Sequence, residues 1–326
     1  MGHRVGVLAA LRNTGWLGFR NKVQRALTGT ACPTDHAMGY PTARGWDLSK
    51  GLQAMVAASK PDVVCVIGIG SQPVPRALDV LALKIPLIYL VMDVDFNGHG
   101  GPLSDLKEAR FIANSRFTAA KLAARYGCPS TVIRPPIHTA RCRVAGTGNK
   151  VVMVNPQPSK GGLIALDLAA ARPDIPFVFY EAWSGDISAI RERARQLPNI
   201  EWRSPVLDPR KVYEEARIML VPSQAEEAWG MVASEAQCSG IPVLGSDIGG
   251  LAESIGDGGV RVAPDAALDV WLAALDQLWN DPQRWADCSA NARARAQRDE
   301  VQIDHQMAAL EQVLRAAVAD AHARAA

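Results

Sequence analysis

The chain of 326 residues is 48% hydrophobic and 21% charged, which is the composition of an ordinary globular protein long enough for two domains. Its formal net charge of +2, with acidic and basic residues interspersed, excludes a general nucleic-acid binder, for which a strong basic excess is expected. No apolar run reaches the roughly 18 residues that a membrane span needs, so we expect no such span.

The six cysteines indicate a reducing compartment. They are scattered along the chain without a C-x-x-C pair, which favours buried thiols in the cytoplasm over a disulfide framework or a zinc site. The apolar stretch at 5–11 is followed by Arg12 and Asn13 rather than by a cleavage site, so it is interpreted as a first strand.

Short β-branched runs alternate with helical stretches along the chain. The runs are continuous rather than alternating in polarity, as in parallel strands that are covered on both faces. Strands are predicted over 5–11, 62–67, 86–91, 110–113, 131–134, 151–154, 176–180, 217–221 and 242–244. Helices are predicted over 115–126, 161–171 and 266–279. Such alternation predicts an α/β fold with doubly wound sheets.

The pattern is interrupted at 140–150, and we place the domain boundary there. We therefore expect a Rossmann-like domain at 1–143, a second one at 144–300 and a C-terminal helix at 301–326.

The most informative segment spans residues 221–253. A predicted strand ends at Pro222, a loop carries Glu227, and a helix that starts near Gly230 carries Glu235. The free backbone N–H groups of Gly230, Met231 and Val232 would form an anion site at the start of that helix. Two carboxylates on either side of an anion site suit a nucleotide sugar, because one can bind the sugar hydroxyls and the other the ribose.

This segment resembles the E-x7-E region of retaining glycosyltransferases of family four, which have the GT-B fold. The similarity includes Pro-Ser before the first Glu, aromatic-Gly after it, Gly-x-Pro-Val and a later Gly-Gly-x-x-Glu that ends at Glu253. The resemblance implies two Rossmann-like domains facing across a cleft. It also implies that Glu227 orients the donor sugar and Glu235 holds the ribose.

A second block supports the same resemblance. The strand at 151–154 leads into Asn155-Pro-Gln-Pro-Ser-Lys160-Gly-Gly, where the family usually has Gly-Arg-x-x-x-x-Lys-Gly. Lys160 matches the lysine that the family places on the pyrophosphate. Asn155 stands where the arginine is usual, so one expected cation is missing unless Arg20 or Arg134 replaces it.

The first half resembles the family in fewer places. Gly15 follows the first strand where family members have a glycine loop near the phosphates, and a simple turn is the competing interpretation. Asp93 matches the Asp of a His-Asp pair near the reacting sugar, although Met92 replaces the His. His99, on the following loop, is expected to be solvated.

Asp93-Val94-Asp95 also resembles the D-x-D metal motif of the other glycosyltransferase fold, GT-A. We reject a metal site because the motif is short and because the second half already supplies a cationic phosphate site. Trp16, Trp46, Trp183 and Trp202 could stack on a substrate, but core packing is expected for each. Arg293, Arg295 and Arg298 are expected on a solvated helix face.

These features predict a cytoplasmic, retaining glycosyltransferase that uses a nucleotide-diphosphate sugar as donor and needs no cofactor or metal. The acceptor can be a natural product, a saccharide or a lipid-linked intermediate. No amphipathic basic helix for membrane docking is evident in the sequence, which favours a soluble acceptor. Two alternatives are a nucleotide-sugar epimerase and a catalytically silent subunit that binds nucleotide. The departures at Asn155 and Met92 keep the silent subunit open.

Overall fold

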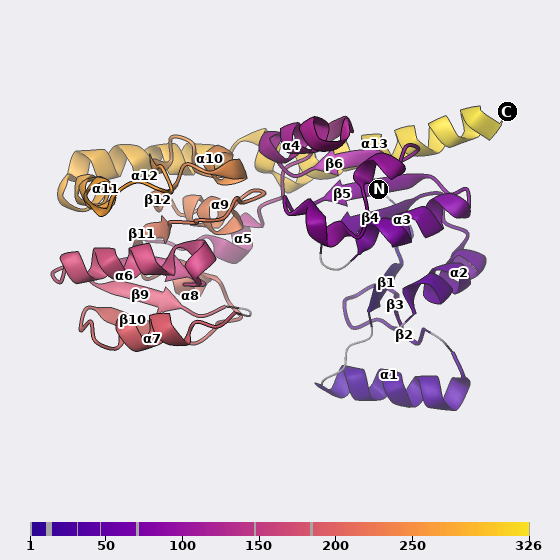
Figure 1. Cartoon of the computed structure of the whole chain (residues 1–326), viewed down its shortest axis with the longest axis horizontal. Coiled ribbons are helices and arrows are strands. Elements are labelled where there is room, and N and C mark those ends of the chain that lie inside the picture. The colour runs from indigo at the N-terminus through magenta and orange to yellow at the C-terminus, as the bar shows by residue number, and fades with distance from the viewer. Residues whose placement is uncertain are drawn as a thin grey trace. The chain divides into compact units, whose positions relative to one another are not determined.

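Figure 1 shows the computed structural model, which describes residues 2–10, 15–30, 32–45, 47–69, 72–146, 148–182 and 185–325. The described residues form two compact units. Unit 1 comprises those within 1–90, 95–111 and 313–326, and unit 2 comprises 91–94 and those within 112–312. This division does not test the predicted boundary at residue 143.

Unit 2 is built on a six-stranded, entirely parallel sheet with the strand order β10-β9-β8-β11-β12-β13. In chain order its strands are β8 (Lys150–Val154), β9 (Phe177–Tyr180), β10 (Ile200–Arg203), β11 (Ala216–Val221), β12 (Val243–Ser246) and β13 (Gly259–Val262). Numbered within the unit, the order is 3-2-1-4-5-6, which is that of the Rossmann fold. The order reverses between β8 and β11.

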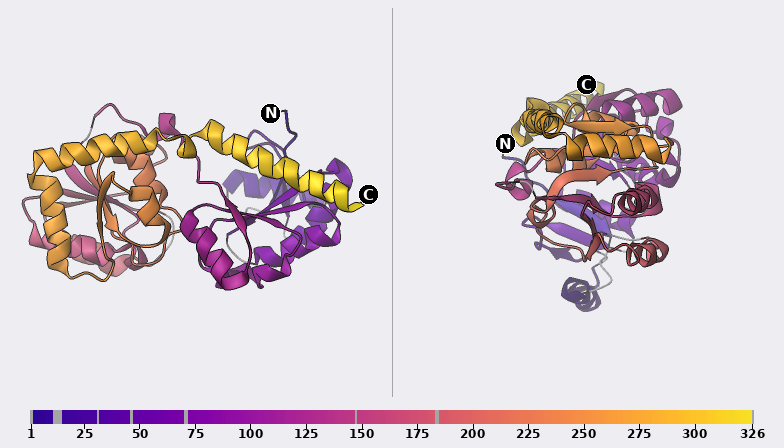
Figure 2. Two further views of the ribbon diagram at one scale, coloured as in Figure 1. Left: turned by 90° about the horizontal axis from the view of Figure 1, so that it is seen from above. Right: turned by 90° about the vertical axis from the view of Figure 1, so that its left-hand side faces the viewer.

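Two hydrophobic cores cover the two faces of this sheet. Successive residues of a strand point to opposite faces, so Val151 and Met153 enter one core while Val152 enters the other. Figure 2 shows the helices around the sheet. They are α5 (Thr139–Cys142), α6 (Gly162–Ala171), α7 (Ser188–Ala194), α8 (Arg210–Tyr213), α9 (Met231–Gln237), α10 (Gly249–Ile255), α11 (Leu268–Asn280) and α12 (Pro282–Ala296). Burial on both faces explains why the strands read as continuous apolar runs.

The N-terminal half divides its strands between two sheets. One has the order β1-β3-β2, from β1 (Val7–Ala10), β2 (Thr34–Asp35) and β3 (Thr42–Gly45), with β2 antiparallel to β3. The other has the order β4-β5-β6-β7, from β4 (Val64–Gly68), β5 (Leu87–Val91), β6 (Arg110–Ala113) and β7 (Ser130–Val132). The helices are α1 (Gly15–Thr28), α2 (Leu48–Ser59), α3 (Pro73–Ala82) and α4 (Arg116–Tyr126), and α13 (Ile303–Ala325) ends the chain.

All nine predicted strands are present, as are the helices predicted over 115–126, 161–171 and 266–279, the helix near Gly230 and the C-terminal helix; the ends are displaced by a few residues, and Leu11 lies outside the described residues. Four strands were not predicted, namely β2, β3, β10 and β13. Each is at most four residues long, and β3 (Thr-Ala-Arg-Gly) carries no apolar run.

The prediction of buried thiols is correct for Cys128, Cys142, Cys238 and Cys288. It is wrong for Cys65, which is exposed, and Cys32 is half-buried. All six cysteines are free.

Candidate functional site

The two segments singled out in the sequence follow neighbouring strands. The loop with Asn155 and Lys160 follows β8, and the loop with Glu227 follows β11. These are the two strands between which the order of the sheet reverses. In open α/β sheets, ligands bind beyond the carboxyl ends of the strands at such a reversal. The topology therefore brings both segments to the expected ligand site of unit 2.

A lysine and a carboxylate meet at this point. Lys160, at the end of a 3₁₀ turn (η3, Pro158–Lys160), has its Nζ 2.6 Å from Glu227 Oε1. The Ser223 hydroxyl donates to the same oxygen at 2.7 Å. The side chain of Lys160 is 36% exposed and that of Glu227 is 18% exposed. Both charged groups are thus held by contacts within the unit while a ligand can still reach them.

Close backbone packing fixes the two loops against each other. The carbonyl of Ser159 accepts hydrogen bonds from the N–H groups of Gln224 (2.9 Å) and Ala225 (3.1 Å). Gly161 has φ +80°, and a Cβ at this position would lie only 1.9 Å from the carbonyl oxygen of Pro222. Only glycine fits here, because any side chain would push the two loops apart.

Replacing Gly161 by alanine is therefore expected to destabilise unit 2 by roughly 2–4 kcal/mol, the sum of backbone strain and steric overlap. Gly127→Ala is the matched control: Gly127 also has a positive φ (+66°), but a Cβ there would meet no atom within 4 Å. We expect the control to cost roughly 1 kcal/mol. Urea unfolding of both variants measures the difference, and equal losses would contradict the packing described here.

The glycine pair at 249–250 positions the backbone of the Glu227 loop. Gly250 N–H donates to the carbonyl of Glu227 at 2.7 Å, and a Cβ on Gly250 would lie 2.1 Å from the carbonyl oxygen of Ala228. The Glu253 carboxylate accepts from the N–H of Phe117 at 2.8 Å, in the first turn of α4. The Gly-Gly-x-x-Glu element thus supports the site through the backbone.

Glu235 occupies a different environment from Glu227. It lies on α9, half-buried, and accepts a hydrogen bond from the Tyr213 hydroxyl at 2.5 Å. Burial raises the pKa of Glu235, and the hydrogen bond from Tyr213 opposes that rise. Tyr213 lies on α8 and was not identified from the sequence, because nothing within the motif points to a residue 22 positions upstream.

The predicted helix with its anion site is short. Gly230 has φ +103°, and α9 (Met231–Gln237) is only seven residues long. The first N–H groups of the helix, including those of Met231 and Val232, have no partner within it. Seven residues contribute less dipole than a long helix, so Lys160 is the stronger source of positive potential.

Asn155 occupies a turn whose backbone conformation suits an asparagine. It has φ +59°, a region in which asparagine is among the most tolerated side chains. Its N–H donates to the carbonyl of Tyr180 at 2.8 Å and its carbonyl accepts from Gln157 at 2.7 Å, so Asn155 turns the chain after β8.

Arg134 is already engaged. Its guanidinium lies 3.6 Å from the carboxylate of Glu253 and 3.3 Å from that of Glu300, and it stacks over the Trp229 ring. Because the side chain is already paired and is only 11% exposed, Arg134 does not take the place of the cation that is missing at Asn155.

In the first half, Gly15 is the first residue of α1, with φ +74° and open space where a Cβ would be. Asp93 follows β5, half-buried, and Asp95 accepts from the N–H of Asn97 at 3.2 Å as the cap of a 3₁₀ turn. Within the described residues, no group of three or more His, Cys, Asp or Glu side chains could hold a metal ion.

The expectation of a solvated His99 is wrong: it is buried, with Nδ1 2.9 Å from the Tyr89 hydroxyl.

Two further expectations need correction. Trp202 packs against Phe179 as expected, but Trp16 is exposed; Trp46 and Trp183 lie outside the described residues. Arg295 does not lie on a solvated face, because its guanidinium donates to the Glu253 carbonyl and pairs with Asp257.

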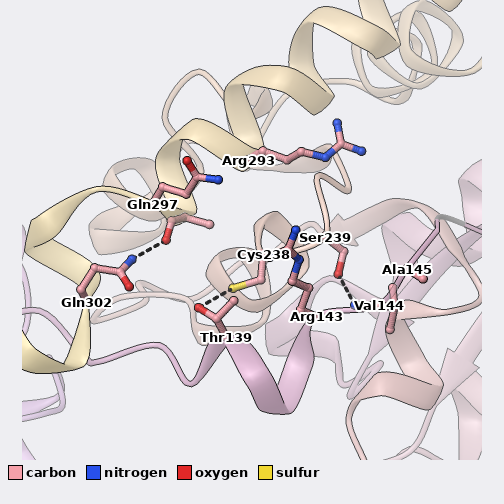
Figure 3. A pocket seen from close by; sticks show the side chains of 10 residues that line it. Thr139, Arg143, Val144, Ala145, Cys238, Ser239, Arg293, Gln297 and Gln302 are labelled. Atoms are coloured by element: carbon pink, nitrogen blue, oxygen red, sulfur yellow. Dashed lines mark hydrogen bonds between the residues drawn. The ribbon is translucent and has the colours of Figure 1, made fainter.

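A cavity of about 440 Å³ lies elsewhere in unit 2 (Figure 3). Arg143, Ser239 and Arg293 line it, together with Gln302 from the segment before α13. None of the predicted site residues lines this cavity, so it belongs to a different part of the unit.

Residues 185–295 match the family model of glycosyl transferases group 1. The D-inositol 3-phosphate glycosyltransferase of Arthrobacter sp. (strain FB24) is 30% identical over 218 residues, which are 58% of this chain and 51% of the relative. The enzyme of the same name from Gordonia bronchialis is 40% identical over 89 residues, which are 27% of this chain and 19% of the relative. The chain thus matches about half, or less, of these relatives' length.

Solved structures are similar over a larger share of the chain. HepE of Anabaena, in complex with UDP-glucose, superposes with a TM-score of 0.72 at 18% identity over 95% of this chain and 91% of HepE. This similarity, with the parallel Rossmann order of unit 2, shows the fold to be GT-B, an α/β architecture with two Rossmann-like domains. No helix in the described part of the chain is both long and apolar enough to span a membrane.

Proposed function

We propose that this chain is a retaining glycosyltransferase that moves a sugar from a nucleoside-diphosphate donor to an acceptor. The observation that carries the proposal is the Lys160–Glu227 pair at the reversal point between β8 and β11. The match of residues 185–295 to group 1 glycosyl transferases includes Glu227 and Glu235, and HepE was solved with UDP-glucose. These two findings favour a transferase over the epimerase and the silent subunit.

In this proposal the donor diphosphate binds beside Lys160. As the bond between sugar and diphosphate breaks, negative charge grows on the leaving phosphate oxygens. The ammonium of Lys160 and the first N–H groups of α9 stabilise this charge, since they are held in place before the reaction. In the structure, Glu227 holds the ammonium of Lys160 at 2.6 Å. When the donor arrives, the diphosphate becomes the second anion on Lys160.

Glu227 then accepts hydrogen bonds from the hydroxyls of the donor sugar, while Glu235 accepts those of the ribose. The acceptor hydroxyl attacks from the face that the diphosphate leaves, and its proton passes to the leaving phosphate oxygen, as the family resemblance implies. We assign Asp93 to the reacting sugar and Gly15 to the phosphates on the same resemblance.

Transfer of a labelled sugar, with NMR assignment of the anomeric configuration of donor and product, tests the proposal; inversion or epimerisation would contradict it.

The raised pKa of Glu235 predicts how donor affinity depends on pH. Below this pKa the carboxyl is protonated and accepts hydrogen bonds poorly. As the pH is lowered, KM for the donor is therefore expected to begin to rise at a higher pH than it would with an ordinary glutamate. Tyr213→Phe removes the hydrogen bond that lowers this pKa, so the acid limb of the profile should move to higher pH. Glu235→Gln should abolish the limb. A Tyr213→Phe profile that superposes on that of the wild type would contradict the role of Glu235.

The proposed mechanism also predicts the effect of removing divalent ions. Because Lys160 supplies positive charge at the diphosphate, transfer by protein stripped with EDTA is expected to stay within about twofold of the rate with added Mn²⁺. Asp95→Asn should have a similarly small effect, since Asp95 caps a turn. Loss of activity that Mn²⁺ restores, together with an inactive Asp95→Asn variant, would move the catalytic centre to the first half.

A further inference from the structure

The cavity of about 440 Å³ in unit 2 lies where three segments of that unit meet: the end of α5, the end of α9, and the end of α12 with the turn that follows it. Figure 3 shows Arg143 reaching from the end of α5 toward the end of α9, with Arg293 on α12 above it. The described residues that line the cavity include these two arginines and no acidic residue. We call it the Arg143–Arg293 cavity.

The two arginines differ from a neighbour on α12 in having no carboxylate partner. Arg295 pairs with Asp257 at 2.9 Å. In the part of the chain that the structure describes, neither Arg143 nor Arg293 forms such a pair. Two positive charges that share a cavity repel each other, and an anion that enters the cavity relieves this repulsion. The charge of the lining therefore favours an anionic ligand.

The acidic residues of the turn after α12 do not neutralise the cavity. They are Asp299 and Glu300, and neither lines it. Glu300 is already engaged, because it pairs with Arg134 at 3.3 Å and with Arg298 at 3.0 Å. The two lining arginines are thus left to a ligand from outside the chain.

Arg293 is held in position by the residues around it. Its Nη1 donates to the Ser289 hydroxyl at 3.0 Å, one turn earlier on α12. Gly240, which has φ +71°, lies against the guanidinium, since a Cβ at this position would be only 2.6 Å from Arg293 Cζ. The glycine lets the guanidinium approach the backbone after α9, and the other N–H groups of its planar fork remain for a ligand.

Neutral polar groups complete the lining. Ser239 is 6% exposed, and its oxygen accepts from the N–H of Val144 at 2.9 Å. Its own O–H hydrogen has no acceptor among the described residues, so the hydroxyl is a further donor for an anion. Gln302 donates its Nε2 to the carbonyl of Ala296 at 2.6 Å, and its amide oxygen remains an acceptor for a hydroxyl group.

We propose that the Arg143–Arg293 cavity binds a phosphoryl group, supplied by the phosphate ester of a small polyol or by inorganic phosphate. A phosphoryl dianion pairs well with planar guanidinium groups, and the Ser239 hydroxyl can donate to a further oxygen. Inorganic phosphate alone would leave much of the 440 Å³ unfilled, and the amide oxygen of Gln302 suits the hydroxyl groups of an ester. The inference goes beyond the proposed function and does not rest on it.

Isothermal titration calorimetry of the full chain at constant ionic strength tests the proposal. The probes are sodium phosphate, sorbitol 6-phosphate and sorbitol, and we expect binding of the phosphorylated probes but not of sorbitol. Arg143→Gln and Arg293→Gln should each raise Kd about tenfold, since each removes charge-assisted hydrogen bonds. Arg143→Lys keeps the charge without the planar fork and should have an intermediate effect. Tighter binding of sorbitol 6-phosphate would assign the cavity to an ester, and equal binding to inorganic phosphate.

Arg141→Gln is the matched control, because Arg141 is an exposed arginine of α5 that does not line the cavity, and it should leave Kd unchanged. Lys160→Ala should retain the binding that depends on Arg143, which separates this cavity from the proposed donor site. Arg143 and Arg293 are exposed, so circular dichroism should show intact folding of their variants. Absence of binding by both phosphorylated probes would overturn the proposal, as would a Kd that Arg143→Gln and Arg293→Gln leave unchanged.

Discussion

Replacing Lys160 by alanine is expected to lower the rate of sugar transfer by about 10²–10³-fold, the usual cost of losing one preorganised charge at a developing anion. Lys160 is partly exposed, and its ion pair with Glu227 contributes little to folding, so the free energy of unfolding should change by less than about 1 kcal/mol. Turnover with saturating donor and acceptor measures the effect, and urea unfolding verifies the fold.

Lys150 provides the control for this variant. It lies at the opposite end of β8, where its Nζ contacts Glu201 at 2.9 Å and Glu215 at 2.8 Å. Burial disfavours the charged amine, but the hydrogen bonds to Glu215 and Glu201 outweigh it and raise the pKa of Lys150. Lys150→Ala should therefore cost stability and leave turnover unchanged. Equal turnover losses in the two lysine variants would indicate a structural role for Lys160.

Replacing Glu227 by alanine or glutamine is expected to lower turnover by about 10²-fold while the protein stays folded, since Glu227 orients the reacting sugar in the proposed mechanism. Its neighbour Glu226 serves as control, because Glu226 pairs with Lys121 of α4 instead of Lys160. Glu226→Gln should retain nearly full activity. An unfolded Glu227→Ala protein would indicate that the carboxylate serves the packing of the loop, and unaltered turnover would remove Glu227 from the mechanism.

The double variant Lys160→Ala/Glu227→Ala separates two explanations of the ion pair. If each group only neutralises the charge of the other, removing both should restore the turnover that either single substitution loses. If both act on the donor, the double variant should be at least as slow as the slower single variant. We expect the second result.

Much of the candidate site could be predicted because its signals are local in sequence. The apolar run of β11, the loop with Glu227 and the helix with Glu235 follow within about 20 residues, and Lys160 stands directly before a glycine pair. Their meeting point could not be derived from the same patterns, because it depends on β8 pairing with β11 over some 65 residues of chain. The strand order supplies this information.

The residues that sequence reasoning missed or misplaced depend on contacts between distant segments. Tyr213 reaches Glu235 from a one-turn helix, and His99 is buried because it pairs with Tyr89. Arg134 could be proposed as a phosphate cation only as long as its two glutamate partners were unknown. In α1 the opposite happened, since apolar side chains that suggest a core lie exposed.

Thermal unfolding in the presence of nucleoside diphosphates tests the central claim, a donor site at Lys160 and Glu227, most directly. A ligand present at 100 times its Kd adds ~2.7 kcal/mol of stability, which raises the Tm measurably. We compare the Tm of each protein with nucleotide to the Tm of the same protein without it. We predict that at least one of UDP, GDP and TDP raises the Tm of the wild-type chain and of the Lys150→Ala variant. The same nucleotide should raise the Tm of the Lys160→Ala variant much less. No increase with any of the three, or an equal increase in Lys160→Ala, would contradict a donor site at the reversal point between β8 and β11.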